Sequence, residues 1–258
     1  MVPAERWWAP FTCPACGGPV TRRDGALSCA NCPESVPVVD GIPRYPVAVD
    51  RPAMPAVFDA LAPIYETPMW FPVMYRLIGG PGAPADDRAA IADGLDAGGG
   101  DVLDVACGTG RFTRYVASEA SVAWGIDVSD GMLRTAARRA ERAGLGNVAF
   151  ARMDAGDLRF ESGRFDCVAC CWALHLFPDR RTVLEEVGRV LKPGGRFAGT
   201  TLTDGSVLAL PGAREGLGRT IGAHVFDSEE LRTLLLEAGF TDVGLDRRGA
   251  ALFFGASR

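Results

Sequence analysis

From residue 101 onward, short apolar runs alternate with longer amphipathic segments. A short apolar run suits a buried strand, and apolar positions three or four residues apart suit a helix packed on one face. Their alternation is typical of βαβ units around a mostly parallel sheet. Strands are predicted at Asp101–Ala106, Val122–Ile126, Val148–Arg152, Phe165–Cys171, Gly195–Leu202, Thr241–Asp246 and Ala250–Gly255, the last two as a closing antiparallel pair.

Helices are predicted between these strands, at Arg111–Ser118, Ser129–Ala143, Arg180–Val190 and Ser228–Ala238. Ser129 and Ser228 are the expected N-caps of two of them, and Gly144 and Gly239 follow the ends of the same two. The turn Lys192-Pro193-Gly194-Gly195 is expected to end the third helix. The pattern as a whole predicts an α/β fold.

A glycine turn follows the first predicted strand, in the segment Asp104-Val105-Ala106-Cys107-Gly108-Thr109-Gly110. Glycines let the backbone approach a ligand closely, and the start of the next helix offers free N–H groups. Asp127 lies 17 residues beyond Gly110 at the end of the second strand. A carboxylate there suits hydrogen bonds to ribose hydroxyls. Taken alone, this pattern also fits a protein that binds a nicotinamide dinucleotide.

Two details favour a methyl donor over a dinucleotide. Thr113 stands where the third glycine of a dinucleotide fingerprint is expected, and Asp104 lies just before the turn, placed to bind the ammonium of a methionine moiety. Asp154 follows the third strand, where it is a candidate acceptor for an adenine amino group, with Ala155 giving backbone contact. Each aspartate alone has a turn or cap role as its alternative. Three of them at successive strand ends would line the carboxyl edge of the sheet, where such folds bind ligands.

The stretch from Asp101 to Thr201 resembles the class I S-adenosylmethionine (SAM)-dependent methyltransferases, especially their ubiquinone/menaquinone-type branch. Besides the glycine turn, the matching segments are Gly125–Ser129, Met153–Ala155, Ala173–Pro178 and Arg189–Gly195. The resemblance implies a Rossmann-like fold with a mostly parallel seven-stranded sheet. It implies that SAM contacts Gly108, Gly110, Asp127, Val128, Met132, Asp154 and Ala155. It leaves the acceptor atom open, because that branch methylates carbon, oxygen, nitrogen and sulfur.

Two Cys-x-x-Cys knuckles lie near the N-terminus, formed by Cys13, Cys16, Cys29 and Cys32 with 12 residues between the pairs. Four thiolates in this spacing suit a tetrahedral structural Zn²⁺ ion. Redox disulfides and an iron–sulfur site are the alternatives. A ribbon ahead of a methyltransferase resembles the zinc-ribbon rRNA guanine methyltransferases and a plastid-type group of uncertain substrate. Phe58–Tyr65, Tyr75-Arg76 and Ala173–His175 look closer to the second group.

Charge argues against recognition of nucleic acid. The chain has a formal net charge of −5, and residues 1–50 contain four arginines and five acidic residues. A zinc ion held by four thiolates adds a formal −2. A ribbon that grips RNA is expected to be basic, because phosphate contacts dominate such affinity. We therefore interpret the ribbon as a folding staple or a support for the lid.

The two histidines of the chain are the catalytic candidates. His175 follows the fourth strand, near the expected donor methyl, where it could act as a general base; packing against the lid is the alternative. His224 precedes the last long helix and could face the substrate. Cys107, Cys167 and Cys170 are interpreted as core residues, whereas Cys171, at a strand end, is a candidate cofactor contact.

These features divide the chain into a zinc ribbon (1–48), a helical lid and linker (49–100) and a SAM-binding methyltransferase domain (101–258). The aromatic segment Phe58–Tyr75 is expected to cover the cofactor crevice, and residues 203–224 are expected to form a substrate loop. The first residues lack a basic start and an apolar core, and no apolar run approaches the ~20 residues that span a bilayer. A cytoplasmic protein without membrane contact is expected.

The leading hypothesis is SAM-dependent methyl transfer to a small organic acceptor, by analogy within secondary metabolism. The alternatives are an rRNA guanine methyltransferase that uses the ribbon to hold RNA, and a non-catalytic module that binds SAM. The expected partner is a small-molecule substrate. The sequence specifies neither the acceptor nor the oligomeric state.

Overall fold

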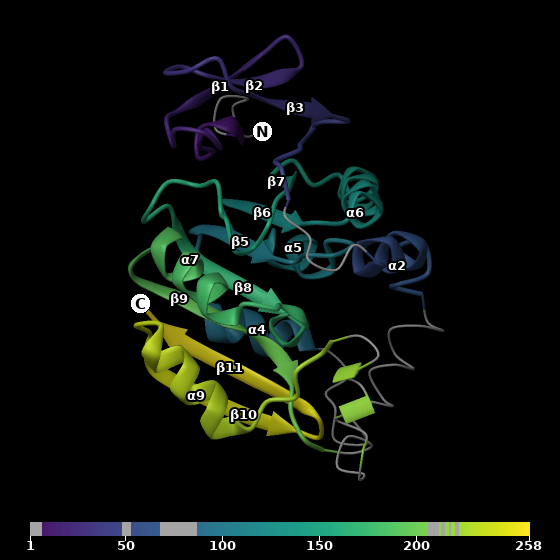
Figure 1. Cartoon of the computed structure of the whole chain (residues 1–258), viewed down its shortest axis with the longest axis vertical. Helices are drawn as coiled ribbons and strands as arrows, with labels where there is room; N and C mark the ends of the chain where they lie inside the picture. Colours follow the sequence, from purple (N-terminus) through teal and green to yellow (C-terminus); the bar gives the residue numbers. More distant parts are fainter. Residues whose placement is uncertain are drawn as a thin grey trace.

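The computed structural model describes residues 7–47, 53–67, 87–205 and 222–258, together with residues 212, 215–216 and 218–219. These residues form a four-stranded sheet and a seven-stranded sheet. In Figure 1 the small sheet lies at the N-terminal end of the molecule and the large sheet fills its centre. Among the helices described, none has both the length and the apolar character needed to cross a bilayer.

The large sheet has the strand order β10-β11-β9-β8-β5-β6-β7. Its central strands β9, β8, β5, β6 and β7 run parallel to one another, and β11 is antiparallel to both β9 and β10. This confirms the predicted mostly parallel sheet and its closing antiparallel pair. The strands span Asp101–Val105 (β5), Val122–Asp127 (β6), Val148–Arg152 (β7), Phe165–Cys171 (β8), Leu191–Leu202 (β9), Thr241–Arg248 (β10) and Ala251–Ser257 (β11).

Helices cover both faces of this sheet (Figure 1). They span Asp87–Leu95 (α4), Arg111–Val116 (α5), Asp130–Arg142 (α6), Arg180–Val190 (α7) and Ser228–Glu237 (α9). On one face Ile91 and Phe112 of α4 and α5 pack in one cluster with Val102 of β5. On the other face Leu184 of α7 and Leu231 of α9 share a cluster with other strand residues. The sheet is therefore buried on both sides, as its continuous apolar strands require.

The helix caps follow local chemistry, with one correction. Ser129 caps α6 as predicted, and its Oγ accepts from the N–H of Met132 at 3.1 Å. The prediction that Ser228 caps α9 was wrong, because Asp227 does so: its Oδ1 accepts from the N–H of Glu229 at 2.8 Å. The Glu230 side chain in turn accepts from the N–H of Asp227, completing a capping box. Ser228 is the first helical residue, one position too late to cap.

Several element boundaries also differ from the prediction, most of them by one or two residues. The helix after the glycine turn ends at Val116 instead of Ser118. Strand β9 begins at Leu191, which pairs with Phe165, and the turn around Gly194 forms an irregularity within the strand instead of a separate loop. Pairing resumes at Cys167 and Arg196.

The small sheet is antiparallel and is attached to the large domain through a common core. Its strands are Val20–Arg23 (β1), Ala26–Cys29 (β2), Ser35–Val39 (β3) and Ile42–Pro43 (β4). Phe11, Leu27 and Val36 from this part of the chain belong to the same buried cluster as Trp124 and Phe160 of the large domain. Helix α2 (Ala53–Leu61) follows and packs against α6.

The capping box at α9 generates a stability prediction. Replacing Asp227 by alanine leaves the N–H of Glu229 without its acceptor, and we expect a loss of about 1 kcal/mol in the free energy of unfolding. Ser228→Ala is the matched control, because this neighbour does not cap the helix, and a change within about 0.5 kcal/mol is expected. Urea unfolding followed by circular dichroism measures both. Equal losses in the two variants would contradict the assignment.

Candidate functional site

The backbone turns sharply between β5 and α5. Gly108 and Gly110 have φ angles of 54° and 70°, which L side chains rarely adopt. A Cβ on Gly110 would lie 3.0 Å from the Cβ of Ala136 and 3.1 Å from the ring of Phe150, so this glycine lets α5 begin close to α6 and β7. A Cβ on Gly108 would meet nothing within 4 Å. Gly108 therefore borders open space at the tip of β5, where a ligand can approach the backbone.

Asp104 places a buried carboxyl directly before this turn. The residue is 1% exposed, and its Oδ2 accepts from the hydroxyl of Thr113 at 2.6 Å. Its Oδ1 is buried and has no hydrogen-bond partner among the described residues. Burial raises the pKa of Asp104 to about 7, and the nearby Asp127 carboxylate adds to the rise. An unsatisfied buried acceptor is costly, so Oδ1 fits a donor brought by a ligand, such as an ammonium group.

Asp127 ends β6 beside the same turn. Its Oδ2 accepts from the N–H of Gly108 at 2.9 Å, and its Oδ1 accepts from the N–H of Ser129 at 2.9 Å. Burial raises the pKa of this carboxyl, and the backbone donors oppose that rise. Each carboxylate oxygen can accept a second hydrogen bond. The carboxylate is thus oriented by two backbone donors and retains capacity for two hydroxyl donors.

The other predicted cofactor contacts lie just after β7, just after β6 and in α6. Asp154 Oδ1 accepts from the N–H of Gly156 at 2.9 Å, so this carboxylate also shapes its own turn. Ala155 and Met132 are 6% and 1% exposed. The carbonyl of Val128 accepts from Arg152 Nε at 3.0 Å. Because β5, β6 and β7 are neighbours in the sheet, the three predicted aspartates lie at adjacent strand tips.

The sequence that forms this edge matches a known family. Residues 102–195 match the family model described as "Methyltransferase domain". The match begins in β5, includes the glycine turn and Asp127, and ends in β9. Residues 102–195 are therefore similar in sequence to methyltransferase domains.

Relatives of known sequence and structure agree with this domain. The chain is 30% identical over 171 residues to an uncharacterized chloroplastic methyltransferase of Arabidopsis thaliana, covering 62% of this chain and 48% of that protein. It is 32% identical over 162 residues to the ubiquinone/menaquinone biosynthesis C-methyltransferase of a Marinomonas species, covering 61% of this chain and 62% of that protein. The chain thus spans between about half and three fifths of the length of these relatives.

Solved structures share the fold. Phosphoethanolamine N-methyltransferase 2 of Haemonchus contortus, in complex with SAM, matches with a TM-score of 0.61 at 18% sequence identity, covering 78% of this chain and 60% of that chain. At such low identity the match establishes the Rossmann-like methyltransferase fold alone. It confirms the fold class predicted from the sequence.

Helix α2 and the turn after it contact α6 and the glycine turn. Asp59 Oδ1 accepts from the hydroxyl of Ser129 at 2.5 Å and from the N–H of Gly131 at 2.7 Å, so it bonds the first turn of α6. Sequence reasoning did not select Asp59, because its N–H partner lies 72 residues away and no local motif marks the pairing. In Figure 1 α2 lies beside α6.

Glu66 provides a second attachment for this segment. It pairs with Arg114 at 2.8 Å and Arg139 at 2.6 Å, and it also accepts from the hydroxyl of Thr109 within the glycine turn. Neighbouring Tyr65 is half-buried among charged groups, and desolvation raises its pKa to about 12. The segment from Phe58 to Tyr65 thus lies over the glycine turn and α6. Trp70, Phe71 and Tyr75, and much of the predicted 203–224 loop, lie outside the described residues.

The two histidines are neighbours. His175 lies in a short 3-10 helix (Leu174–Leu176), is 6% exposed and has its Nδ1 3.4 Å from the hydroxyl of Thr201. Burial lowers the pKa of His175 to about 3, and the positive charge of Arg180 adds to this effect. The backbone N–H of His224 donates to the carbonyl of His175 at 2.8 Å. The His224 ring is 2.6 Å from Glu230 Oε1.

Cysteines in and beside the sheet behave mainly as core residues. Cys107, Cys167 and Cys170 are buried, and burial raises the pKa of each thiol. Cys171 is half-buried at the end of β8, and burial, with Asp104 and Asp87 nearby, raises the pKa of its thiol well above the usual value. None of these four thiols is an activated nucleophile, because activation requires a lowered pKa.

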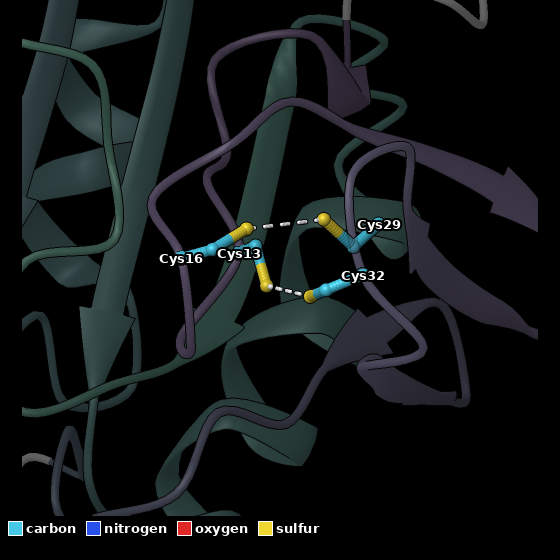
Figure 2. Close-up of side chains that lie close together, drawn as sticks. All are labelled: Cys13, Cys16, Cys29 and Cys32. Carbon is cyan, nitrogen blue, oxygen red and sulfur yellow. Dashed lines mark hydrogen bonds between the residues drawn. The ribbon is translucent and has the colours of Figure 1, made fainter.

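The four N-terminal cysteines converge, as Figure 2 shows. The sulfur atoms of Cys13, Cys16, Cys29 and Cys32 all lie within 4.8 Å of one another. Cys13 Sγ is 3.6 Å from Cys32 Sγ, and Cys16 Sγ is 3.5 Å from Cys29 Sγ. A disulfide requires sulfurs about 2.05 Å apart, whereas four thiolates about 2.3 Å from one Zn²⁺ lie roughly 3.8 Å apart. The cluster therefore has the donor set and spacing of a tetrahedral metal site.

Buried, neutral His175 predicts an acid-sensitive fold. The folded pKa of about 3 lies below the unfolded value of about 6.5, so the unfolded chain binds this proton first. Its contribution is present at neutral pH and is lost as pH falls from about 6.5 toward 3. Between pH 7 and pH 5 we expect the free energy of unfolding to fall by about 2 kcal/mol more in the wild type than in His175→Gln. Urea unfolding at the two pH values measures the difference.

His224→Gln serves as the control, because it removes the other histidine and keeps the buried one. This variant is expected to retain the acid sensitivity of the wild type. An identical pH dependence in His175→Gln and the wild type would show that His175 is not held neutral by burial.

Proposed function

We propose that this chain transfers the methyl group of SAM to a small organic acceptor. The observation that carries the proposal is Asp104 Oδ1, a buried acceptor for which the described part of the chain provides no partner, beside the open backbone of Gly108. SAM offers an ammonium, ribose hydroxyls and an adenine amino group, which are the donors that three carboxyl groups at neighbouring strand tips require. When bound, SAM supplies an electrophilic methyl group on its sulfonium.

Different residues of the chain bind different parts of this cofactor. Asp104 binds the ammonium group, Asp127 binds the ribose hydroxyls, and Asp154 with Ala155 binds the adenine. Gly108 and Gly110 keep the backbone close to the cofactor, while Val128, Met132 and Cys171 complete the apolar surroundings. The segment 53–67, attached through Asp59 and Glu66, covers the crevice and excludes water.

A small acceptor fits the chain better than RNA does. The net charge is −5, which opposes the phosphate contacts that dominate affinity for nucleic acids. The ribbon shares its core with the large domain. The Marinomonas relative is named for C-methylation in quinone biosynthesis, which is also a reaction on a small molecule.

Proton abstraction is not required of His175 in this proposal. A general base works best with a pKa near the operating pH, and the pKa of His175 is about 3. We assign His175 to the wall of the acceptor pocket as a neutral polar group. His224, held by Glu230, borders the same region through its backbone contact with His175. Positioning of the acceptor then accounts for the rate.

The four-cysteine cluster is proposed to bind Zn²⁺ as a structural ion. All four ligand positions are occupied by thiolates, so no position remains for water or substrate. The ion would link the two knuckles and hold the ribbon against the domain.

A binding titration tests the cofactor assignment. Isothermal titration with S-adenosylhomocysteine is expected to show one site in the wild type. In Asp127→Asn the affinity should fall roughly 10- to 100-fold, because hydrogen bonds to a charged acceptor are lost. Asp166→Asn is the matched control, since this strand aspartate binds Lys192 and the N–H of Asp101 instead of the glycine turn. Absence of binding to the wild type would refute the proposal.

The raised pKa of Asp104 predicts a pH-dependent affinity. With a pKa of about 7, the carboxyl is mostly protonated at pH 6 and mostly ionised at pH 8, and only the ionised form pairs with an ammonium. The affinity for S-adenosylhomocysteine should therefore rise by up to about tenfold from pH 6 to pH 8. Asp104→Asn should bind more weakly and lose this dependence. If the affinity of Asp104→Asn still rose with pH, another titrating group would be responsible for the dependence.

A further inference from the structure

The ribbon holds both ends of the loop proposed to bind adenine. This loop, residues Met153–Leu158, joins β7 to the segment that contains Phe160. At its start the N–H of Tyr45 donates to the carbonyl of Arg152 at 3.0 Å. At its end the N–H of Thr12 donates to the carbonyl of Arg159 at 2.9 Å. Two backbone hydrogen bonds from the N-terminal region therefore fix the distance between the two ends of the loop.

The two residues that hold the loop are bonded to each other. The Tyr45 hydroxyl donates to the carbonyl of Thr12 at 3.1 Å, and Tyr45 is 1% exposed. The ring of Phe11 stacks on that of Phe160 with centroids 4.9 Å apart. Thr12 is followed directly by Cys13, which is fully buried and belongs to the four-cysteine cluster. Thr12, which holds one end of the loop, is thus adjacent in the sequence to a proposed metal ligand.

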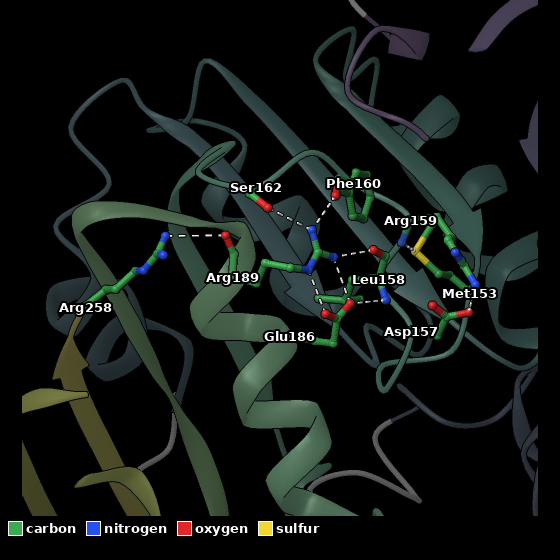
Figure 3. A network of polar contacts seen from close by, with 9 residues as sticks. All are labelled: Met153, Asp157, Leu158, Arg159, Phe160, Ser162, Glu186, Arg189 and Arg258. Atoms are coloured by element: carbon green, nitrogen blue, oxygen red, sulfur yellow. Dashed lines mark hydrogen bonds and ion pairs between the residues drawn. The ribbon is translucent and has the colours of Figure 1, made fainter. Parts of the chain in front are cut away.

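Helix α7 hydrogen-bonds the far end of the same loop, as Figure 3 shows. Glu186 Oε2 accepts from the N–H of Leu158 at 2.7 Å, and Arg189 donates to the carbonyls of Leu158 at 2.5 Å and Phe160 at 2.8 Å. Within the loop, the N–H of Arg159 donates to Met153 Sδ at 3.2 Å. The beginning of the loop, next to Asp154 and Ala155, is held by the bond from Tyr45 and by the N–H of Met153, which donates to the carbonyl of Asp127 at 3.1 Å.

A further contact from the ribbon reaches the neighbouring strand tip. Arg44 pairs with Asp130 at 2.7 Å, in the first turn of α6. Arg152, whose carbonyl binds Tyr45, donates from its side chain to the carbonyl of Val128 at 3.0 Å. Residues 44 and 45 therefore contact the first turn of α6 and the end of β7, which are proposed to border the nucleoside.

We propose that the metal-loaded ribbon is a positioning element of the cofactor site, which sets the adenine side of the pocket through Tyr45 and Thr12. The inference rests on the proposed function, because it needs SAM at the strand tips and a metal ion at the cysteines. Metal binding holds Cys13, and with it Thr12 and the loop, in the geometry that recognises adenine. Metal occupancy thereby controls affinity for the cofactor without any metal contact to it.

The first test separates recognition of adenine from general stability. Zinc-loaded full-length wild type and Tyr45→Phe are titrated with S-adenosylhomocysteine and with its inosine analogue, which has a carbonyl in place of the adenine amino group. Tyr45→Phe keeps the buried ring and removes the bond to Thr12. We expect the preference for the adenine ligand to fall about fivefold, the effect of about one hydrogen bond. Tyr115 lies in α5, away from the contacts between the ribbon and the loop, so Tyr115→Phe should keep the preference of the wild type.

The second test changes the metal itself. The full chain is stripped with a chelator, its fold is checked by circular dichroism, and S-adenosylhomocysteine is titrated before and after Zn²⁺ is returned. A folded, metal-free protein should bind about tenfold more weakly and recover on reloading. Equal affinity of the two folded forms would overturn the inference, and so would an unchanged adenine preference in Tyr45→Phe.

The two proposals fail in different ways. If zinc-loaded wild type binds neither nucleoside ligand, the proposed function fails and the inference falls with it. If the ligand binds but the ribbon has no influence, only the inference fails. Should the stripped protein unfold, the adenine preference of Tyr45→Phe decides alone, because that variant retains its metal.

Discussion

The proposed cofactor site depends on Asp104, a carboxyl group that the fold removes from water. Inside β5 it is almost fully buried, and Thr113 satisfies only one of its oxygens. Removing a carboxylate from water is costly without compensating donors, and the cost appears as a pKa raised to about 7. A parallel sheet can hold such a group because its strands are set by backbone bonds and by helices on both faces. In the proposed site, a cationic donor from the ligand would offset part of this desolvation cost.

The same logic extends along the edge of the sheet. Asp127 is also desolvated, yet the N–H groups of Gly108 and Ser129 hold its oxygens in place. Thr113, standing where a dinucleotide-binding turn would place a third glycine, supplies the hydroxyl that orients Asp104. In the proposed site, this difference within one turn favours an ammonium group over a pyrophosphate. Asp59 and Glu66 close this edge by binding α6 and the glycine turn instead of solvent.

Local chemistry explains which features were predictable from sequence. Continuous apolar runs identified β7 and β8 to the residue, and cysteine spacing identified the cluster, because each is set by neighbours in the chain. The cap at Asp227 was missed by one position, since two capping residues stand side by side. Attachments such as Glu66 to Arg114, 48 residues apart, carry no local signal, because only the folded sheet brings them together. The roles of individual site residues remain predictions.

The interface between the ribbon and the large domain relates the proposed metal site to the proposed nucleoside site. A four-stranded sheet of this size buries too little surface to be stable alone, and such modules rely on a metal or a partner surface. Here the ribbon has a partner surface, because its apolar residues complete a core that begins at Phe165 and continues through Phe160 to Phe11. The proposed Zn²⁺ ion would add the metal. The loop that follows β7 passes through that shared core. In the proposed arrangement, a metal ion that holds the ribbon to the domain also constrains this loop, and the geometry at the cysteines reaches the strand tips through backbone hydrogen bonds.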